Sequence, residues 1–319
     1  MIFEQRLSIA LWVLLAGAGT VAAQDFPNHP LRLVASEAGG GGDLAARMIA
    51  QNIAPLLGQP VVVENHGGGV IAGDIVARAP ADGHTLLIYG NTLWLLPLMR
   101  ASVPYDPLRD FTPVSLAARA PNILVVLPSL PVKSVADLIA LAKASPGKLN
   151  YGSAAAGTIN HLAAELFKSM AGVDLVRVPY KGTASIMNAL MAGEVQLIFG
   201  TSASVTVQVR AGRLHALAVT TLERTPVFPE LPTMSASGLP GFESVSLHGV
   251  FAPAKTPAAA VNRLNAEIVK VLARADVRER FLANGVETVA GPPADLAAAM
   301  KSEIARFGKV IRAAGIRDE

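Results

Sequence analysis

Apolar positions along the first half of the chain follow patterns that predict alternating strands and helices. Short apolar runs over residues 31–36, 60–64 and 86–89 predict three strands, whereas apolar residues in 44–57 recur at helical spacing. A short helix is expected over residues 71–78. Because strand, loop and helix repeat in this order, we expect a parallel, doubly wound sheet and an α/β fold.

The second half continues this alternation and begins a new structural unit. Ser134 precedes a helical pattern and is expected to cap it. Further strands are predicted over residues 122–127, 148–153, 176–180, 195–199 and 214–220. Helices are predicted over residues 135–144, 160–171, 186–191, 261–274 and 295–313. The last two helices are amphipathic and should pack on one of the domains rather than form a third.

Two loops of small residues each lie between a predicted strand and a predicted helix. The first contains four consecutive glycines, Gly39 to Gly42, and the second runs from Ala154 to Thr158. A helix N-terminus exposes unpaired N–H groups and carries partial positive charge, and a glycine loop lets an anion approach these donors. Two such loops facing one cleft would clamp a small anion without a cationic side chain.

Other interpretations of the glycine run are a phosphate loop, a dinucleotide site and a plain flexible connection. A phosphate loop needs a Lys-Ser/Thr pair after its glycines, and none follows here. Gly40, Gly42 and Ala45 fit the dinucleotide pattern, and Glu64 lies about 20 residues further on. Any run of four glycines makes such a match easy, so a carboxylate-binding loop is favoured. Asp43 is expected to cap the following helix.

Length and composition narrow the classes of function. At roughly 150 residues per domain, 319 residues suffice for two domains. The absence of cysteine excludes disulfides and thiolate metal sites. The net charge of +3 comes without a dense basic cluster, so no nucleic-acid partner is expected. Five histidines are considered as metal ligands: His29, His66, His84, His215 and His248. They lack the sequence spacing of metal ligands, so no metal or cofactor is expected.

Residues 1–23 have the organisation of a secretory signal peptide. Arg6 provides a short basic start, residues 7–18 are apolar, and small residues precede a cleavage point after Ala23. An apolar core of about a dozen residues is too short to cross a bilayer, which needs roughly 20. We therefore expect an exported, soluble periplasmic chain, and export away from the nucleotide pool weighs against the dinucleotide interpretation.

An ordered set of segments resembles the substrate-binding receptors of tripartite tricarboxylate transporters, also called the Bug receptor family. The matching segments include LGQPVVVEN (57–65), ADGHTLLI (81–88), VPYDPLRDFTPVSL (103–116), SPGKLNYGSA (145–154), GTINHLAAELF (157–167), VPYKGTASIMNALMAGEVQLIF (178–199), AGRLHALAVTT (211–221), PELPTMSASGLPGFE (229–243) and GVFAPAKTPAAAVNRLNAEIVKVL (249–272). The resemblance implies a two-domain periplasmic binding protein of the type II, Venus-flytrap class with crossover strands. It places residues 25–123 and 250–319 in domain 1 and residues 124–249 in domain 2.

The resemblance also implies a set of ligand-binding residues on the loops of both domains. The expected set is Ala38, Gly39, Gly40, Gly41, Asp43, Asn91, Thr92, Ser153, Gly157, Thr158, His161, Thr201 and Ser202. In the first loop, Glu37 replaces the usual proline and Gly42 stands where threonine is frequent. Residues 200–202 lack the Asp or Asn that is common there, which disfavours amino-acid ligands.

The implied function is capture of a small organic carboxylate in an interdomain cleft and its delivery to a membrane permease. The receptor is expected to be a monomer without enzymatic activity. One alternative is an exported enzyme, either nucleotide-dependent or a hydrolase that uses Ser153, His161 and Asp174, although no G-x-S-x-G elbow is present. Another alternative is a ligand sensor for a signalling kinase.

Overall fold

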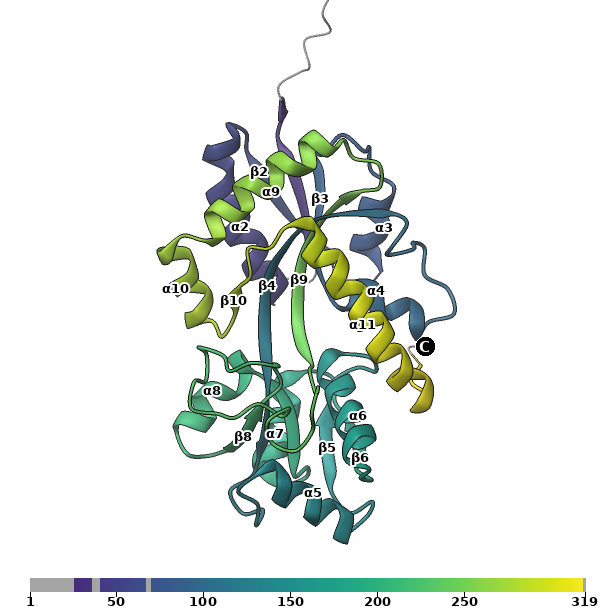
Figure 1. The fold of residues 1–319 in the computed structure, drawn as a ribbon, viewed down its shortest axis with the longest axis vertical. Helices are drawn as coiled ribbons and strands as arrows, with labels where there is room; N and C mark the ends of the chain where they lie inside the picture. The colour runs from purple at the N-terminus through teal and green to yellow at the C-terminus, as the bar shows by residue number, and fades with distance from the viewer. Residues whose placement is uncertain (1–25, 36–40, 67–69, 318–319) are drawn as a thin grey trace, which may run out of the picture.

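Two sheets joined by long central strands build the molecule. The computed structural model describes the chain except residues 1–25, 36–40, 67–69 and 318–319. Strand β4 (Phe111–Val126) pairs with β9 (Val245–Pro253) through its first part, and its last five residues pair with β7 in the second sheet. Figure 1 shows both strands running between an upper and a lower group of elements. We call these groups the first and second lobe.

The first lobe contains a mixed sheet covered by helices on both faces. Its strand order is β2-β1-β3-β9-β4, with the short β10 also on β4. The strands β1 (Leu31–Ala35), β2 (Val61–Asn65) and β3 (Thr85–Gly90) are parallel, whereas β9 is antiparallel to β3 and β4. The remaining strand is β10 (Glu287–Thr288). The expected parallel sheet is therefore wrong for this lobe as a whole, because the two strands that connect the lobes run against each other.

Alternate residues of β1 point to opposite faces of the sheet, and each face has its own apolar core. Leu31 and Leu33 pack under α2, α9 and α10, whereas Val34 packs under α3, α4 and α11. The helices are α2 (Gly41–Leu57), α3 (Ile71–Ala77), α4 (Thr92–Leu95), α9 (Ala258–Leu272), α10 (Ala275–Ala283) and α11 (Pro293–Ala313). A short 3₁₀ turn over Leu96–Leu98 follows α4.

The second lobe repeats this layering on a smaller sheet. Its strands are β5 (Asn150–Ser153), β6 (Val176–Pro179), β7 (Leu197–Thr201), β8 (His215–Val219) and the end of β4. Its helices are α5 (Val135–Ala144), α6 (Ile159–Ala171), α7 (Thr183–Ala192) and α8 (Ser202–Arg210). Ser134 caps α5 as predicted, because its side chain accepts a hydrogen bond from the Asp137 N–H at 3.1 Å.

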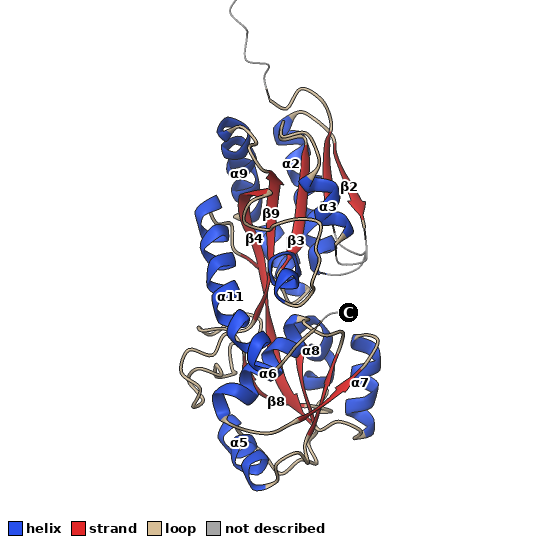
Figure 2. Cartoon of the chain, turned by 90° about the vertical axis from the view of Figure 1, so that its right-hand side faces the viewer, coloured by secondary structure: helices blue, strands red, loops and turns tan. Residues whose placement is uncertain are grey.

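One apolar core continues from the first lobe into the second. Phe307 of α11 and Phe167 of α6 belong to the same buried cluster, which also receives residues of α3, α4 and α5. Figure 2 shows α11 descending along the first lobe toward α6. The helices α2 and α8 lie on the opposite faces of their sheets, in separate clusters. In the part of the chain that the structure describes, no helix combines the length and apolarity needed to span a bilayer.

Candidate functional site

A cavity of about 470 Å³ lies between the two lobes, on the side of α2 and α8. The first lobe contributes the start of α2, including Gly41 and Asp43, together with the turn after α10. The second lobe contributes Thr201 and Ser202, where β7 passes into α8. Ala120 of β4 and Ser246 and His248 of β9 form further parts of the wall. The remaining lining residues are Leu44, Arg47, Met48, Gln51, Ala203, Asn284, Gly285 and Val286.

The first turns of two helices border this cavity. As described, α2 begins at Gly41, and α8 begins at Ser202 after Thr201, which is extended with φ −63° and ψ 146°. Each N-terminus presents backbone N–H groups and the positive end of a helix dipole. With one such end on each lobe, the cavity provides two places where an anionic group is stabilised.

His248 is a wall residue that the sequence analysis considered only as a metal ligand. A Cβ atom added to Gly41 would lie 2.9 Å from His248 Nε2, so the imidazole rests directly against the α2 backbone. His248 Nδ1 is buried and has no hydrogen-bond partner within the described residues. Burial lowers the pKa of His248 to about 4, so the ring is neutral at pH 7 and retains one N–H donor.

The carboxylate of Asp43 is held by its neighbours and does not face the cavity as a bare charge. Asp43 is only 6% exposed, and its Oδ1 accepts a hydrogen bond from Asn65 Nδ2 at 2.8 Å. Arg47 Nε donates to Asp43 Oδ2 at 3.1 Å. Asp43 lies within the first turn of α2 as described, instead of preceding the helix as a cap. Arg47 also places a cation at the cavity, where the sequence analysis expected no cationic side chain.

The small-residue loop of the second lobe packs against the first lobe and is absent from the described lining of this cavity. A Cβ atom on Gly157, whose φ is +75°, would approach Met99 Sδ to 2.2 Å. The Gly157 N–H donates to His161 Nδ1 at 3.0 Å. Ser153 Oγ accepts a hydrogen bond from Arg177 Nε at 2.7 Å, and Thr158 Oγ1 donates to the carbonyl of Ala155 at 3.0 Å.

These bonds do not assemble the hydrolase considered from the sequence. His161 is buried, and burial together with the nearby Arg177 charge lowers its pKa to about 4. Its Nδ1 is already an acceptor for the Gly157 backbone, while Ser153 Oγ accepts from Arg177. Among the described residues, Ser153 and His161 are therefore not paired as nucleophile and base.

The Asn91 side chain makes hydrogen bonds to β9 and α11. Its side-chain amide donates to the Val245 carbonyl at 3.1 Å and to Glu303 Oε2 at 2.6 Å, and its oxygen accepts the Leu247 N–H at 2.8 Å. Both amide hydrogens are thus used within the protein, so we leave Asn91 out of the site proposed below. Thr92 begins α4 directly after it.

Ser202 connects the lobes, because its Oγ donates to the Gly285 carbonyl at 2.5 Å. The structure therefore brings together Gly41, Asp43, Thr201 and Ser202 of the expected set around one cavity. Ser153, Gly157, Thr158 and His161 form a second group at the start of α6. Ala38, Gly39 and Gly40 lie outside the described residues.

Comparisons with known proteins agree with this architecture. The family model described as "Tripartite tricarboxylate transporter family receptor" matches residues 45–316. A relative from Pseudomonas sp. strain P51, described as "UPF0065 protein in tcbD-tcbE intergenic region", is 41% identical over 307 residues, covering 95% of this chain and 91% of its own.

Two solved structures of related proteins contain ligands. R. palustris Rpa4515 with adipate is 39% identical with a TM-score of 0.79, over 92% of this chain and 99% of that one. MatC from Rhodopseudomonas palustris with bound malate is 32% identical with a TM-score of 0.73, over 90% of this chain and 100% of that one. Both share the fold of this chain over most of its length. The chain belongs to the tripartite tricarboxylate transporter family of receptors.

Proposed function

We propose that this receptor binds a small organic dicarboxylate in the cavity between its lobes. The observation that carries the proposal is the pair of helix N-termini, of α2 and α8, that border one cavity from opposite lobes. The related structures with adipate and malate support a ligand that has a carboxylate at each end. The chain is therefore a binding protein, and no step of catalysis is assigned to it.

One carboxylate would lie at the start of α2, beside Gly41 and the neutral His248. The other would lie at the start of α8, beside Thr201 and Ser202. Leu44, Met48 and Val286 line the same cavity and offer apolar contact to the carbon chain between the two acids. Gly157 and His161 would act indirectly, by holding the neighbouring loop of the second lobe.

A ligand that contacts both lobes favours the arrangement in which they are close together, because those contacts are lost when the lobes separate. The strands β4 and β9 connect the lobes and would bend during such a hinge motion. We propose domain boundaries near residues 124 and 249, so that residues 25–123 and 250–319 move against residues 124–249.

We also propose that the receptor acts in the periplasm after removal of residues 1–23, because these residues have the organisation of a secretory signal peptide. There it would act as a monomer that delivers its ligand to the membrane permease of a tripartite tricarboxylate transporter. Deleting the chromosomal copy should abolish uptake of the ligand by whole cells. If uptake persisted while a signalling response to the ligand disappeared, the alternative role as a sensor for a kinase would be favoured.

Calorimetry with matched acids tests the proposed site. We expect adipate to bind at least about tenfold more tightly than hexanoate, because each charge-assisted anchor contributes about 1.5 kcal/mol or more. Thr201→Val should weaken adipate binding, whereas Thr112→Val, at the far end of β4, should not. Equal binding of adipate and hexanoate would contradict the two-anchor arrangement, whereas no effect of Thr201→Val would exclude the Thr201 hydroxyl as a ligand contact. Consumption of the ligand would contradict the receptor role.

A further inference from the structure

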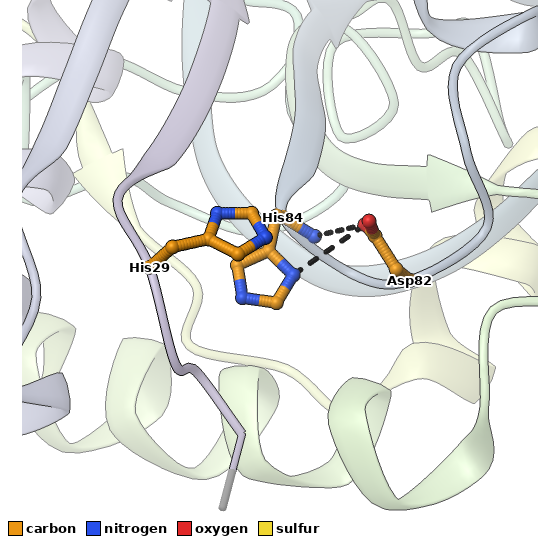
Figure 3. Close-up of side chains that lie close together, drawn as sticks. All are labelled: His29, Asp82 and His84. Atoms are coloured by element: carbon orange, nitrogen blue, oxygen red, sulfur yellow. Dashed lines mark hydrogen bonds and ion pairs between the residues drawn. The ribbon is translucent and has the colours of Figure 1, made fainter. Parts of the chain in front are cut away.

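Two histidines and an aspartate meet at the end of the first lobe where β1 and β3 begin. His29 lies shortly before β1, and Asp82 and His84 lie in the turn before β3 (Figure 3). One ligand atom from each of the three side chains lies within 4.8 Å of the others. The strands β1 and β3 are parallel neighbours, and the Arg32 N–H donates to the His84 carbonyl at 2.8 Å. Strand pairing thus brings together residues whose sequence separation gave no metal-binding pattern.

His84 has ring nitrogens without hydrogen-bond partners. The side chain is buried, with 8% of the residue exposed, and within the described residues neither Nδ1 nor Nε2 has a hydrogen bond. Asp82 Oδ1 accepts the His84 backbone N–H at 2.8 Å and lies 3.5 Å from His84 Nδ1. Buried polar atoms normally have a partner, so these nitrogens are free to bind a ligand. The orphaned nitrogen and the carboxylate face each other (Figure 3).

Aromatic rings pack against His84 on two sides. The His29 ring stacks on the His84 ring with centroids 3.6 Å apart, and the Phe26 ring packs against His84 in a T-shaped arrangement with centroids 5.0 Å apart. His29 and Asp82 are exposed, so both side chains are able to rotate toward a common ion.

We propose that His29, Asp82 and His84 bind one divalent transition-metal ion, with water completing its coordination. Two imidazole nitrogens and one carboxylate oxygen form a donor set suited to Zn²⁺ or Cu²⁺, whereas Ca²⁺ and Mg²⁺ prefer oxygen alone. Rotation of the exposed His29 ring out of its stacked position, together with rotation of Asp82, would bring the donor atoms to bond lengths of about 2.0–2.2 Å. Bound metal would tie the segment before β1 to the turn before β3.

The proposed metal site is separate from the carboxylate cavity. It lies where β1 and β3 begin, whereas the cavity lies beyond the opposite ends of these parallel strands, near the start of α2. Its expected effect is therefore on stability. Saturating Zn²⁺ should raise the Tm by about 4 °C or more, because the ion binds the folded chain alone. Adipate affinity should be the same with and without Zn²⁺.

Metal titration of the mature chain tests this site, using protein prepared without a histidine tag and stripped with EDTA. We expect one Zn²⁺ per chain by calorimetry, and nitrogen hyperfine coupling in the electron paramagnetic resonance spectrum of bound Cu²⁺. His84→Ala, His29→Ala and Asp82→Ala should each weaken Zn²⁺ binding by about tenfold or more. His215→Ala, on β8 of the other lobe, is the matched control and should bind as the wild type does.

The proposal is overturned if the wild type binds no stoichiometric Zn²⁺. It is also overturned if His29→Ala and Asp82→Ala bind Zn²⁺ as tightly as His215→Ala does. Because His29 and Asp82 are exposed, these two variants decide the question even if His84→Ala fails to fold. Neither failure would bear on carboxylate binding, which is measured separately with adipate.

Discussion

Glu303 offers a quantitative test of how the first lobe is held to the crossing strands. This residue of α11 is 1% exposed, and its Oε2 accepts hydrogen bonds from Asn91 Nδ2 at 2.6 Å and from Trp94 Nε1 at 2.8 Å. Oε1 is buried without a hydrogen-bond partner among the described residues. Burial raises the pKa of Glu303 to about 7, although the two donors and the nearby Arg306 partly oppose that rise. Oε1 lies 3.9 Å from Arg306 Nη2.

The sign of the pH dependence follows from this raised pKa. The folded chain binds the proton up to about pH 7, whereas the unfolded chain releases it near 4.5. The stability that Glu303 contributes is therefore fully present below about pH 4.5 and is lost as the pH rises through about 7. At about 1.4 kcal/mol per pH unit this interval corresponds to about 3 kcal/mol, of which about 2.5 kcal/mol falls between pH 5 and pH 8.

Glu303→Gln should remove this dependence, because the amide oxygen still accepts from Asn91 and Trp94 but carries no titratable proton. We expect the unfolding free energy of Glu303→Gln, relative to the wild type, to rise by about 2.5 kcal/mol from pH 5 to pH 8. Urea unfolding at both pH values measures this difference. His161 and His248, whose pKa values are lowered to about 4, lose stability on acidification in both proteins and so cancel.

An exposed acid provides the control for this experiment. Glu230→Gln removes a carboxylate from the surface and should leave the pH dependence of unfolding unchanged. If the difference between Glu303→Gln and the wild type were the same at pH 5 and pH 8, Glu303 would titrate alike in the folded and unfolded chains. The argument that burial holds its proton would then be refuted.

Three further changes probe the cavity and the contacts between the lobes. Gly41→Ala places a Cβ atom 2.9 Å from His248 Nε2, and calorimetry should show at least about tenfold weaker adipate binding. Ser202→Ala removes the hydrogen bond to the Gly285 carbonyl, which is worth about 1 kcal/mol. The lobes should then separate more easily, and the radius of gyration from small-angle scattering should increase. Unchanged scattering would contradict a role of Ser202 in holding the lobes together. Gly157→Ala should lower the unfolding free energy by about 2 kcal/mol, because the φ of Gly157 is +75° and Met99 leaves no room for a side chain there. An unchanged Tm would count against the contact with Met99.

Periodicity predicted most of the elements, but those it missed include the first part of β4, β9, α8 and α10. Residues 202–210 contain three valines and a threonine, which disfavour helix, and the helix forms because Val205 is buried against β7 and β4. The strand Val245–Pro253 alternates apolar residues with Ser246 and His248, which is a pattern typical of a strand with one buried face. Its antiparallel pairing also explains why a purely parallel sheet was the wrong expectation.

The candidate site was only partly predictable for a related reason. Gly41 was found because a glycine loop before a predicted helix is visible in the sequence, whereas Thr201 and Ser202 came from the family resemblance. His248 reaches the cavity from a strand, next to a helix far away in the sequence, and no local pattern reports that proximity. The cluster of His29 and His84 was missed for the same reason, because it depends on the pairing of β1 with β3.

The apolar core shared by α11 and α6 joins the two lobes along one side of the molecule. Phe307 and Phe167 lie on this joined side, whereas the cavity lies on the other side, between α2 and α8. Separating the lobes at the cavity would expose polar helix ends and small side chains. Separating them on the joined side would expose aromatic rings to water, which costs much more free energy. In the proposed hinge motion a solute would therefore enter and leave from one side, and a permease that distinguishes loaded from empty receptor would contact that side.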